Sequence, residues 1–159
     1  THSQIFATDL LPVDVSEELN LAKKYKLKNK TCPYCHILKL ETKSSRKIYA
    51  DQYIAAFTPY ASEFHYEAWI FTKRHLDNIT KLSPLEFKSF AKVLKKILMK
   101  LNLLNLSYNY FMHQVISEPD QHFYLKIQPR ESIWGGLELG SGLVINSVLP
   151  ETAAAYYRK

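Results

Sequence analysis

The stretch Ser83-Pro84-Leu85-Glu86 decides how the rest of this chain is interpreted. Ser83 and Glu86 form a capping box, and Pro84 stands at the first helical position, so a helix begins here. The apolar residues that follow recur at i, i+3, i+4 and i+7: Phe87, Phe90, Val93, Leu94, Ile97, Leu98 and Leu101. This spacing predicts one long amphipathic helix that ends near Leu104.

Short runs rich in β-branched and aromatic residues lie before and after this helix and predict strands. They are residues 48–51, 53–58 and 67–72 before it, and residues 110–116, 122–128 and 143–147 after it. Residues 3–10 predict a further strand, residues 16–28 a helix, and Pro150 with Glu151 begins a terminal Ala-rich helix. Adjacent strands with one long helix inserted predict an α+β fold, an antiparallel sheet with helices packed on one face.

The length of 159 residues and a hydrophobic content of 47% suit one globular domain, or half of a larger one. Four glycines and two cysteines exclude collagen-like chains and disulfide scaffolds. No apolar run reaches the roughly 18 to 20 residues of a membrane helix, and the polar start Thr1-His2-Ser3-Gln4 is not typical of a signal peptide. We therefore expect a soluble, cytoplasmic protein with no membrane partner.

The net charge is +6, and the lysines gather in two clusters. These are Lys23, Lys24, Lys26, Lys28 and Lys30, and then Lys92, Lys95, Lys96 and Lys100. A basic chain favours anionic partners such as nucleotides, sugar phosphates or nucleic acid. No aromatic-basic surface motif accompanies the lysines, so we interpret both clusters as solvated helix faces and do not expect nucleic acid as a partner.

The motif Cys32-Pro33-Tyr34-Cys35 has a spacing suited to a metal or a redox pair. A tight turn here allows both thiolates to point at one ion, and a structural zinc site needs four such ligands. The other two can come from the histidines His36, His65, His75, His113 and His122. His75 follows one predicted strand and His122 opens another, so both can reach a shared site at the sheet edge. The alternative is a pair of buried free cysteines with unrelated surface histidines.

His2 and Gln4 stand two residues apart, which places both side chains on the same face of a strand, about 7 Å apart along the chain. A neutral imidazole at His2 can attack a phosphorus atom while the Gln4 amide holds a non-bridging oxygen. The alternative is a frayed chain end without a function.

All four glycines of the chain fall within residues 135–142: Gly135, Gly136, Gly140 and Gly142. Glycine permits close backbone approach to a ligand, and Glu138 among them can accept hydrogen bonds from sugar hydroxyls. The segment is neither a Walker loop nor a dinucleotide fingerprint. We interpret it as a ligand loop; the alternative is a tight connection between strands.

Several longer motifs occur together: Pro59-Tyr60-Ala61-Ser62-Glu63-Phe64-His65-Tyr66-Glu67-Ala68-Trp69-Ile70, Lys73-Arg74-His75, Tyr108-Asn109-Tyr110, Gln121-His122-Phe123, Pro129-Arg130, Gly136-Leu137-Glu138-Leu139-Gly140-Ser141-Gly142, Ile145-Asn146 and Pro150-Glu151-Thr152-Ala153-Ala154. In this combination they resemble the galactose-1-phosphate uridylyltransferase family, a branch of the histidine-triad superfamily whose members have two similar halves. The resemblance covers nearly the whole chain and implies a histidine-triad-like fold. It implies that residues 1–159 are the C-terminal half, with residues 1–12 as a catalytic strand belonging to the preceding half and residues 13–159 as the C-terminal domain.

The resemblance also implies a reaction. In the family's His-x-His-x-Gln motif the second histidine is the nucleophile; it matches His2, and Gln4 matches the residue that holds the phosphate. This implies ping-pong transfer of UMP or AMP between sugar 1-phosphates or phosphate through a nucleotidyl-histidine. The implied partners are nucleotide-sugar and sugar-phosphate substrates, the N-terminal half of the same protein, and a second copy of the protein. The implied sugar-phosphate contacts are Gly135, Gly136, Glu138, Gly140 and Asn146.

The resemblance assigns the ligands of a structural Zn²⁺ as well. In family members with a zinc in the second half, the ligands carry over to Cys32, Cys35, His75 and His122. Other members hold iron through a glutamate and three histidines. Glu18 and His113 match two of these ligands, but Lys126 and Gln128 stand where the other two histidines would be, so the resemblance does not imply iron here.

The pattern is closer to the branch that includes ADP-glucose phosphorylase, with Leu137 in place of the usual aromatic residue and Tyr124 in place of a frequent histidine. Both uridine and adenosine stay open as the base. The leading hypothesis is an enzyme of the UDP-glucose:hexose-1-phosphate uridylyltransferase type. The alternatives are an ADP-glucose phosphorylase-type adenylyltransferase and a non-catalytic, zinc-stabilised nucleotide-binding module.

Overall fold

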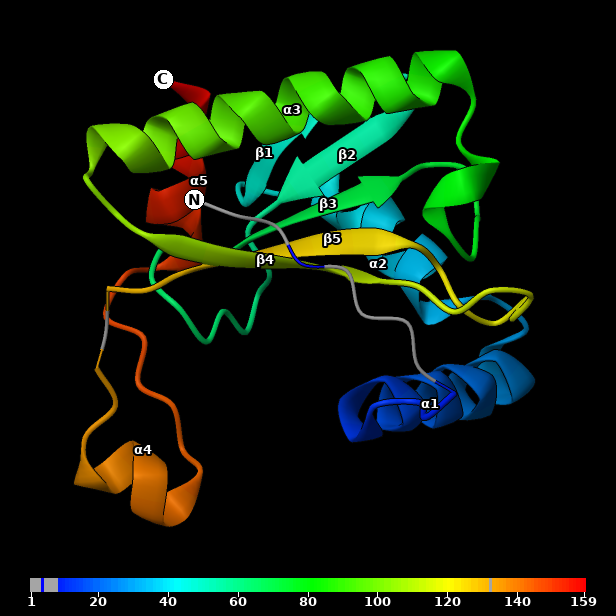
Figure 1. The fold of residues 1–159 in the computed structure, drawn as a ribbon, viewed down its shortest axis with the longest axis horizontal. Helices are drawn as coiled ribbons and strands as arrows, with labels where there is room; N and C mark the ends of the chain where they lie inside the picture. Colours follow the sequence, from blue (N-terminus) through cyan, green and yellow to red (C-terminus); the bar gives the residue numbers. More distant parts are fainter. Residues whose placement is uncertain (1–3, 5–8, 132) are drawn as a thin grey trace.

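An antiparallel sheet of five strands forms the centre of the protein (Figure 1). The computed structural model describes Gln4 and residues 9–131 and 133–159. The strands are β1 (Lys47–Ala50), β2 (Ile54–Phe57), β3 (Ala68–Thr72), β4 (Tyr108–His113) and β5 (Tyr124–Pro129). Their order in the sheet is β1-β2-β3-β5-β4, and every neighbouring pair is antiparallel. β4 is therefore an edge strand of the described sheet.

Helices α3 (Pro84–Leu103) and α5 (Pro150–Arg158) cover one face of the sheet. α3 begins as the sequence predicts, because the Ser83 hydroxyl accepts from the Glu86 backbone and the Glu86 carboxylate accepts from the Ser83 backbone. Its buried face packs with the sheet and α5 in one core, which includes Phe90, Ile97, Ile70, Ile127 and Tyr157. Removal of this apolar surface from water is the main favourable term that holds the two layers together.

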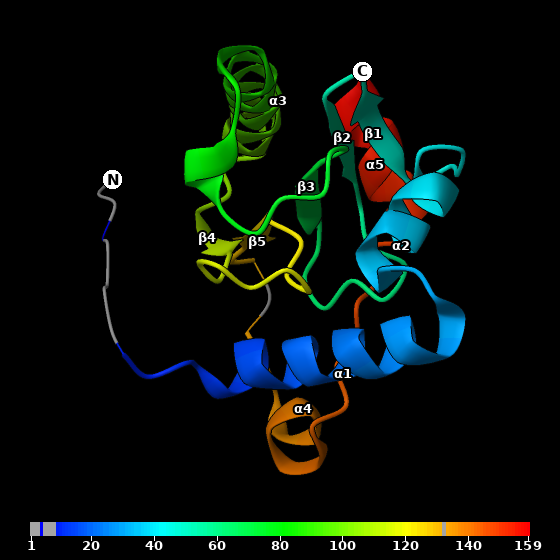
Figure 2. The same ribbon diagram turned by 90° about the vertical axis from the view of Figure 1, so that its right-hand side faces the viewer.

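The opposite face of the sheet also carries helices. α2 (Pro33–Glu41) places Leu38 among Phe57, Phe71 and Tyr124. α1 (Val13–Asn29) lies on the same side, away from α3, and its buried side chains are Leu19 and Ala22 (Figure 2). The α+β class, the antiparallel sheet and the helical layer of α3 and α5 are confirmed, and α2 adds cover on the second face.

The prediction of a strand at residues 143–147 is wrong. These residues have no regular structure and belong to an arm, defined as residues 130–131 and 133–149, which leaves the sheet after β5 and returns at α5 (Figure 1). No strand of the described sheet lies beside them, and an extended run needs a neighbouring strand to form a ladder. The glycine segment forms the short helix α4 (Gly136–Ser141) on this arm, ended by Gly142 at a φ of 72°.

The remaining predictions differ from the structure mainly at element boundaries. The strand predicted at residues 110–116 begins at Tyr108 and ends at His113, which pairs with the first residue of β5. Of the strand predicted at residues 3–10, only Gln4, Asp9 and Leu10 are described, and none of these three lies in a strand; the other residues lie outside the described part of the chain. A short 3-10 helix, Ile79–Lys81, follows β3. Among the described residues, no helix combines the length and the apolar character that a membrane crossing requires.

Candidate metal centre

The two cysteines lie at the start of α2. Cys32 is the N-cap residue, and Cys35 follows within the first turn, where the His36 amide donates to the Cys32 carbonyl at 3.1 Å. One helical turn brings both sulfurs to the same side, and the positive end of the helix dipole favours their thiolate forms. The predicted turn is therefore the first turn of a helix that the sequence interpretation missed.

The two histidines reach the cysteines from neighbouring ends of the sheet. His75 follows β3, and His122 precedes β5; the two strands are paired, with Phe71 opposite Tyr124. The Cys35 sulfur lies 3.4 Å from His75 Nδ1 and 3.6 Å from His122 Nδ1. Donor atoms of all four predicted ligands fall within 4.8 Å of one another.

The far nitrogen of each imidazole meets a backbone carbonyl. His122 Nε2 donates to the Thr72 carbonyl at 2.8 Å, and His75 Nε2 donates to the Pro119 carbonyl at 3.0 Å. A carbonyl can only accept, so each Nε2 carries a hydrogen, and in the neutral form of each ring Nδ1 presents a lone pair to the cluster. Such outer partners fix the tautomer and the ring orientation that metal binding needs. These carbonyls escaped the sequence interpretation because a backbone acceptor has no residue signature.

The two thiols differ in acidity because they share one hydrogen bond. The hydrogen bond from Cys35, together with those of His122 and His75, lowers the pKa of Cys32 to about 2 despite its partial burial. The same contact raises the pKa of Cys35. The hydrogen bond with Cys32 raises the pKa of His75. The contacts within the cluster thus favour the thiolate form of Cys32, and metal binding would displace the remaining protons.

Two sulfurs and two imidazole nitrogens from three elements form a closed set of four donors, which is the typical composition of a structural zinc site. No ion is included in the structure, and the donor chemistry and tautomers fit a divalent ion of borderline softness. The set predicted from strand ends and from the resemblance therefore comes together in space.

A second cluster lies beside the cysteine–histidine set. It consists of Glu18 of α1 and the side chains around its carboxylate, and we call it the Glu18 cluster. The Glu18 carboxylate accepts from the Tyr124 hydroxyl at 3.0 Å and the Tyr34 hydroxyl at 3.3 Å. His113 Nδ1 lies 3.0 Å from the same carboxylate. Burial opposes ionisation of Glu18, but His113, Tyr124 and the charge of Lys126 outweigh it and lower the pKa of this carboxyl.

This second cluster does not offer the iron ligand set. Tyr124 and Lys126 are the β5 residues beside Glu18, whereas Gln128 pairs with Asn109 further along the sheet. Among the described residues, neither ring nitrogen of the buried His113 has a hydrogen-bond partner, although Nδ1 lies 3.0 Å from the Glu18 carboxylate. Two of the four expected ligand positions therefore offer no ligand here, because Gln128 lies further along the sheet and a lysine ammonium cannot ligate a metal.

The residues predicted to contact substrate are not gathered in one place. His2 lies outside the described residues, and Gln4 is exposed. The segment that contains Gly135, Gly136, Glu138 and Gly140 sits at the far end of the arm, away from the sheet (Figure 1). The Glu138 carboxylate accepts from the Gly135 amide at 2.9 Å. The Asn146 amide donates to the carbonyls of Ser62 and Phe64, so its side chain is engaged at the base of the arm.

The first lysine cluster, on α1, is partly paired within the chain. Lys23 lies 3.1 Å from Glu118, and Lys26 lies 2.6 Å from Asp120. Both acidic residues flank Pro119, whose carbonyl orients His75. These lysines therefore help to hold the loop beside the candidate metal centre, which agrees with a helix face rather than a nucleic-acid surface.

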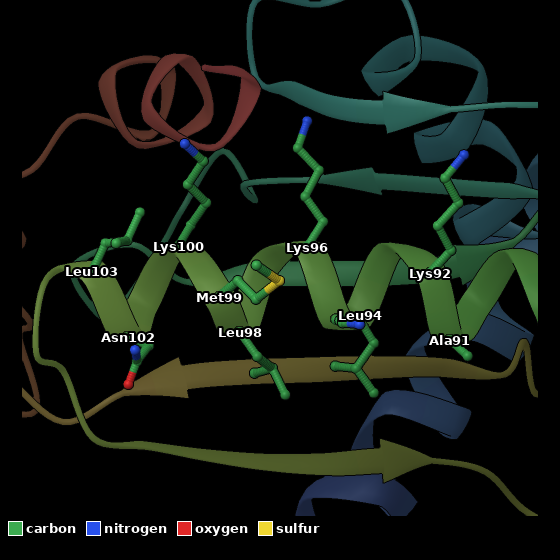
Figure 3. A pocket seen from close by; sticks show the side chains of 10 residues that line it. Ala91, Lys92, Leu94, Lys96, Leu98, Met99, Lys100, Asn102 and Leu103 are labelled. Carbon is green, nitrogen blue, oxygen red and sulfur yellow. The ribbon is translucent and has the colours of Figure 1, made fainter.

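The second lysine cluster borders a groove on α3. Figure 3 shows Lys92, Lys96 and Lys100 on one side of the helix and Leu94 and Leu98 on the other. The groove has a volume of about 840 Å³, and the residues that line it all belong to α3. It is a mixed apolar and basic surface on the side of the molecule opposite α1.

Comparison with known proteins identifies the relatives of this chain. It is 31% identical to a galactose-1-phosphate uridylyltransferase of Thermotoga maritima over 99% of its length. It is 30% identical to an ADP-glucose phosphorylase of Arabidopsis thaliana over 100% of its length. Over almost its whole length the chain is therefore similar to galactose-1-phosphate uridylyltransferases and to ADP-glucose phosphorylase. It spans about half of these curated relatives, 54% of the first and 46% of the second. No protein-family model matches it.

Solved structures share the fold. A uridylyltransferase structure matches with a TM-score of 0.84 and 24% identity, covering 94% of this chain and 51% of that chain. An ADP-glucose phosphorylase from Arabidopsis thaliana with bound ADP-glucose matches with a TM-score of 0.82 and 28% identity, covering 94% and 50%. A zinc-bound histidine triad family protein from Mycobacterium smegmatis gives a TM-score of 0.57 and 18% identity, covering 81% and 91%. The predicted histidine-triad-like fold is confirmed.

Proposed function

We propose that the chain is part of a nucleotidyltransferase that moves a nucleoside monophosphate between sugar 1-phosphates or phosphate. The observation that carries the proposal is the sequence match to a uridylyltransferase over 99% of the chain. The segment Thr1-His2-Ser3-Gln4 resembles the family's catalytic motif, in which the second histidine is the nucleophile. His2 is the proposed catalytic residue, and Gln4 is the proposed phosphate contact.

The proposed reaction has two balanced steps. In the first, the His2 imidazole attacks the α-phosphorus of the nucleotide sugar, the bond to the β-phosphate oxygen breaks, and the sugar 1-phosphate leaves. In the second, a phosphate oxygen of the acceptor attacks the same phosphorus, and the bond to nitrogen breaks. An imidazole suits this role because its nitrogen is nucleophilic when neutral and the phosphoramidate that forms remains reactive. The residues Gly135, Gly136, Glu138, Gly140 and Asn146 are the proposed sugar-phosphate side of the site.

The second candidate function differs in the base. The match to an ADP-glucose phosphorylase covers 100% of the chain at 30% identity, only one percentage point below the uridylyltransferase match. An adenylyltransferase that uses phosphate as the acceptor would share the same nucleophile. We place the uridylyl enzyme first and retain the adenylyl enzyme as the alternative.

Zinc in a structural role is part of the proposal. Cys32, Cys35, His75 and His122 form the closed donor set described above, and a zinc-bound histidine triad protein shares the fold. The ion would join α2 to the ends of β3 and β5 and has no place in either chemical step. A cytoplasmic location agrees with the two cysteines, which are free thiols in the structure.

The proposed partners are the N-terminal half of the same protein and a second copy. The edge strand β4 supports a partner at that side of the sheet, because Phe111 and Met112 are 39% and 38% exposed there. An exposed edge with apolar side chains is a surface that proteins normally cover. A matching half beside β4 would extend the sheet.

The test is covalent labelling of the protein that contains both halves. Incubation with UDP-glucose labelled in uridine should leave label on the protein that is stable to base and released by acid. His2→Asn should abolish the label, and the matched variant His36→Asn, an exposed histidine hydrogen-bonded to Tyr25, should retain it. ADP-glucose labelled in adenosine, run in parallel, assigns the base.

Label that survives in His2→Asn would contradict the proposed nucleophile. Absence of label with both nucleotide sugars would favour the non-catalytic, zinc-stabilised module. The chain of 159 residues without its preceding half is expected not to turn over. Turnover by that chain alone would show that the N-terminal half is not needed.

A further inference from the structure

The described residues of the arm, 130–131 and 133–149, have almost no core of their own. Leu137, Leu139, Leu143 and Ile145 are between 54% and 73% exposed, and α4 extends away from the sheet (Figure 1). Nothing within such a segment fixes its direction, since buried apolar contacts are what give a segment local stability. Its position must therefore be set where its two ends meet the body of the protein.

One histidine touches both ends of the arm. His65, in the loop between β2 and β3, has Nδ1 3.1 Å from a Glu131 carboxylate oxygen and Nε2 3.0 Å from the Ser147 hydroxyl. An ionised carboxylate only accepts, so Nδ1 donates to Glu131, and the neutral ring accepts from Ser147 at Nε2. Glu131 is at the outgoing end of the arm and Ser147 at the returning end, so a single ring ties the two together.

Two further contacts join the same loop to the arm. The Asn146 amide donates to the carbonyls of Ser62 and Phe64 at 3.0 and 3.2 Å. The Phe64 ring stacks on Trp134 with centroids 5.9 Å apart and planes 23° apart. Residues 62–65 thus contact the outgoing end of the arm through Trp134 and its returning end through Asn146. These contacts add to those of His65.

The loop of residues 62–65 is itself joined to the sheet by Glu67. This side chain is 2% exposed and accepts from the backbone amides of Glu63 and Phe64 at 2.9 and 3.3 Å. Its other oxygen accepts from the Trp69 indole at 2.7 Å, and Trp69 belongs to β3. A continuous series of hydrogen bonds therefore runs from β3 through Glu67 and the loop to His65 and the arm.

The order Ser147–His65–Glu131 is also that of a hydrolytic triad, but the surroundings do not suit one. Ser147 is exposed, and Glu131 has 45% of its side chain exposed. A catalytic triad keeps its carboxylate buried so that it can orient the imidazole and stabilise the imidazolium. The contacts of His65 with Glu131 and Ser147 are therefore structural contacts at the surface, and we call them the fastening of the arm.

We propose that His65 is a positioning residue that holds both ends of the arm, so that residues 135–142 stay in one place to receive the sugar phosphate. The proposal rests on the proposed function for its ligand, but the fastening itself does not. His65 touches neither the substrate nor the reacting atoms; it acts through Glu131 and Ser147.

The test combines hydrogen exchange with ligand affinity in the same protein used for labelling. In His65→Ala, amide exchange in residues 136–143 should rise about tenfold or more, while exchange in β2 and β3 stays unchanged. The dissociation constant for UDP-glucose should rise about tenfold, with zinc content and melting temperature unaltered. The control His36→Ala should leave exchange of the arm and affinity as in the wild type.

Two conservative variants separate the two contacts. His65→Asn places an amide near the Nδ1 position and keeps a donor for Glu131, whereas His65→Gln reaches the Nε2 position and keeps a partner for Ser147. Each should restore part of the wild-type exchange and affinity. Unchanged exchange of the arm in His65→Ala would overturn the fastening. A freed arm with unchanged UDP-glucose affinity would overturn the positioning role. A wild-type protein that does not bind UDP-glucose would remove the proposed ligand and leave the fastening to be judged on exchange alone.

Discussion

His122 and Tyr124 stand two residues apart at the start of β5, on the same side of the strand, and they belong to clusters of different character. Around His122, two sulfurs and two imidazole nitrogens converge within 4.8 Å. Around Tyr124, one carboxylate collects two hydroxyls and an imidazole, with Lys126 as the neighbouring positive charge. Tyr34 touches both, since its ring lies edge-on to His122 at 6.4 Å and its hydroxyl reaches Glu18.

The two clusters differ in the groups that hold their side chains in place. Backbone carbonyls hold His75 and His122 so that their free nitrogens face one point. In the Glu18 cluster the acceptor is already satisfied by protein donors, and the positive charge comes from Lys126. One cluster needs an ion to be complete, whereas the other is neutralised within the chain. Histidine and acidic residues near one another are therefore not by themselves a metal site; the other side chains around them decide.

The largest expected effect comes from breaking the cysteine–histidine set. Cys35→Ser should lower the zinc content from about one equivalent to less than about half and destabilise the fold by at least about 4 kcal/mol, because a structural ion contributes its binding energy to folding. Elemental analysis of the purified protein and chemical denaturation check this. The control Ser44→Ala, at a residue just beyond the C-terminal end of α2, should keep its zinc. Equal zinc in Cys35→Ser and wild type would contradict the four-ligand assignment.

A smaller loss of stability is expected from a substitution in the Glu18 cluster. Glu18→Gln removes the charge that two hydroxyls and His113 surround, and should cost about 1–3 kcal/mol in the free energy of unfolding at neutral pH. Its zinc content should stay at the wild-type value. Denaturation beside Glu17→Gln, the exposed neighbour on α1, measures the difference. Loss of zinc in Glu18→Gln would show that the two clusters are not independent.

The same pair of proteins gives a pH dependence with a definite sign. The pKa of Glu18 is lowered from its usual value of 4.5 in the folded protein, so its carboxylate stabilises the fold fully above that value. This contribution is lost as the pH falls from about 4.5 through the lowered folded pKa. The difference in the free energy of unfolding between wild type and Glu18→Gln should therefore be constant from pH 8 to about pH 5 and become smaller below pH 5. If this difference became larger on acidification, the Glu18 carboxylate would not stabilise the fold in the way that its lowered pKa predicts.

The parts of the molecule that follow local rules were predictable from sequence. The capping box at Ser83 and Glu86 and the apolar spacing after it define α3, and the β-branched runs define the sheet. The cysteine–histidine set was within reach because its residues stand at the ends of predicted elements, where sheet topology brings them together. Each of these features is encoded in residues that are close in sequence or periodic.

The missed features depend on contacts between distant residues. α2 has only nine residues, so Cys32 to Cys35 appeared as a turn rather than as a helix start. Residues 143–147 have the composition of a strand but no neighbour to pair with, and no local signal records that. The contacts of His65 with Glu131 and Ser147 span 66 and 82 positions. Only the folded backbone shows that these side chains meet.

The smallest expected effect tests how the second cluster is neutralised. Lys126→Met keeps the aliphatic stem over the rings of Trp69 and Phe111 but removes the charge, and should cost less than about 1 kcal/mol, because partly exposed charges interact weakly in water. The loss should shrink as salt is raised, and Lys126→Arg should behave as the wild type. Denaturation at low and high salt measures this. If Lys126→Met were as destabilising as Glu18→Gln, then the lysine charge rather than the hydroxyl donors would hold the carboxylate. The second cluster would in that case be an ion pair that occupies the place of a metal, and the two clusters would differ only in the source of their cation.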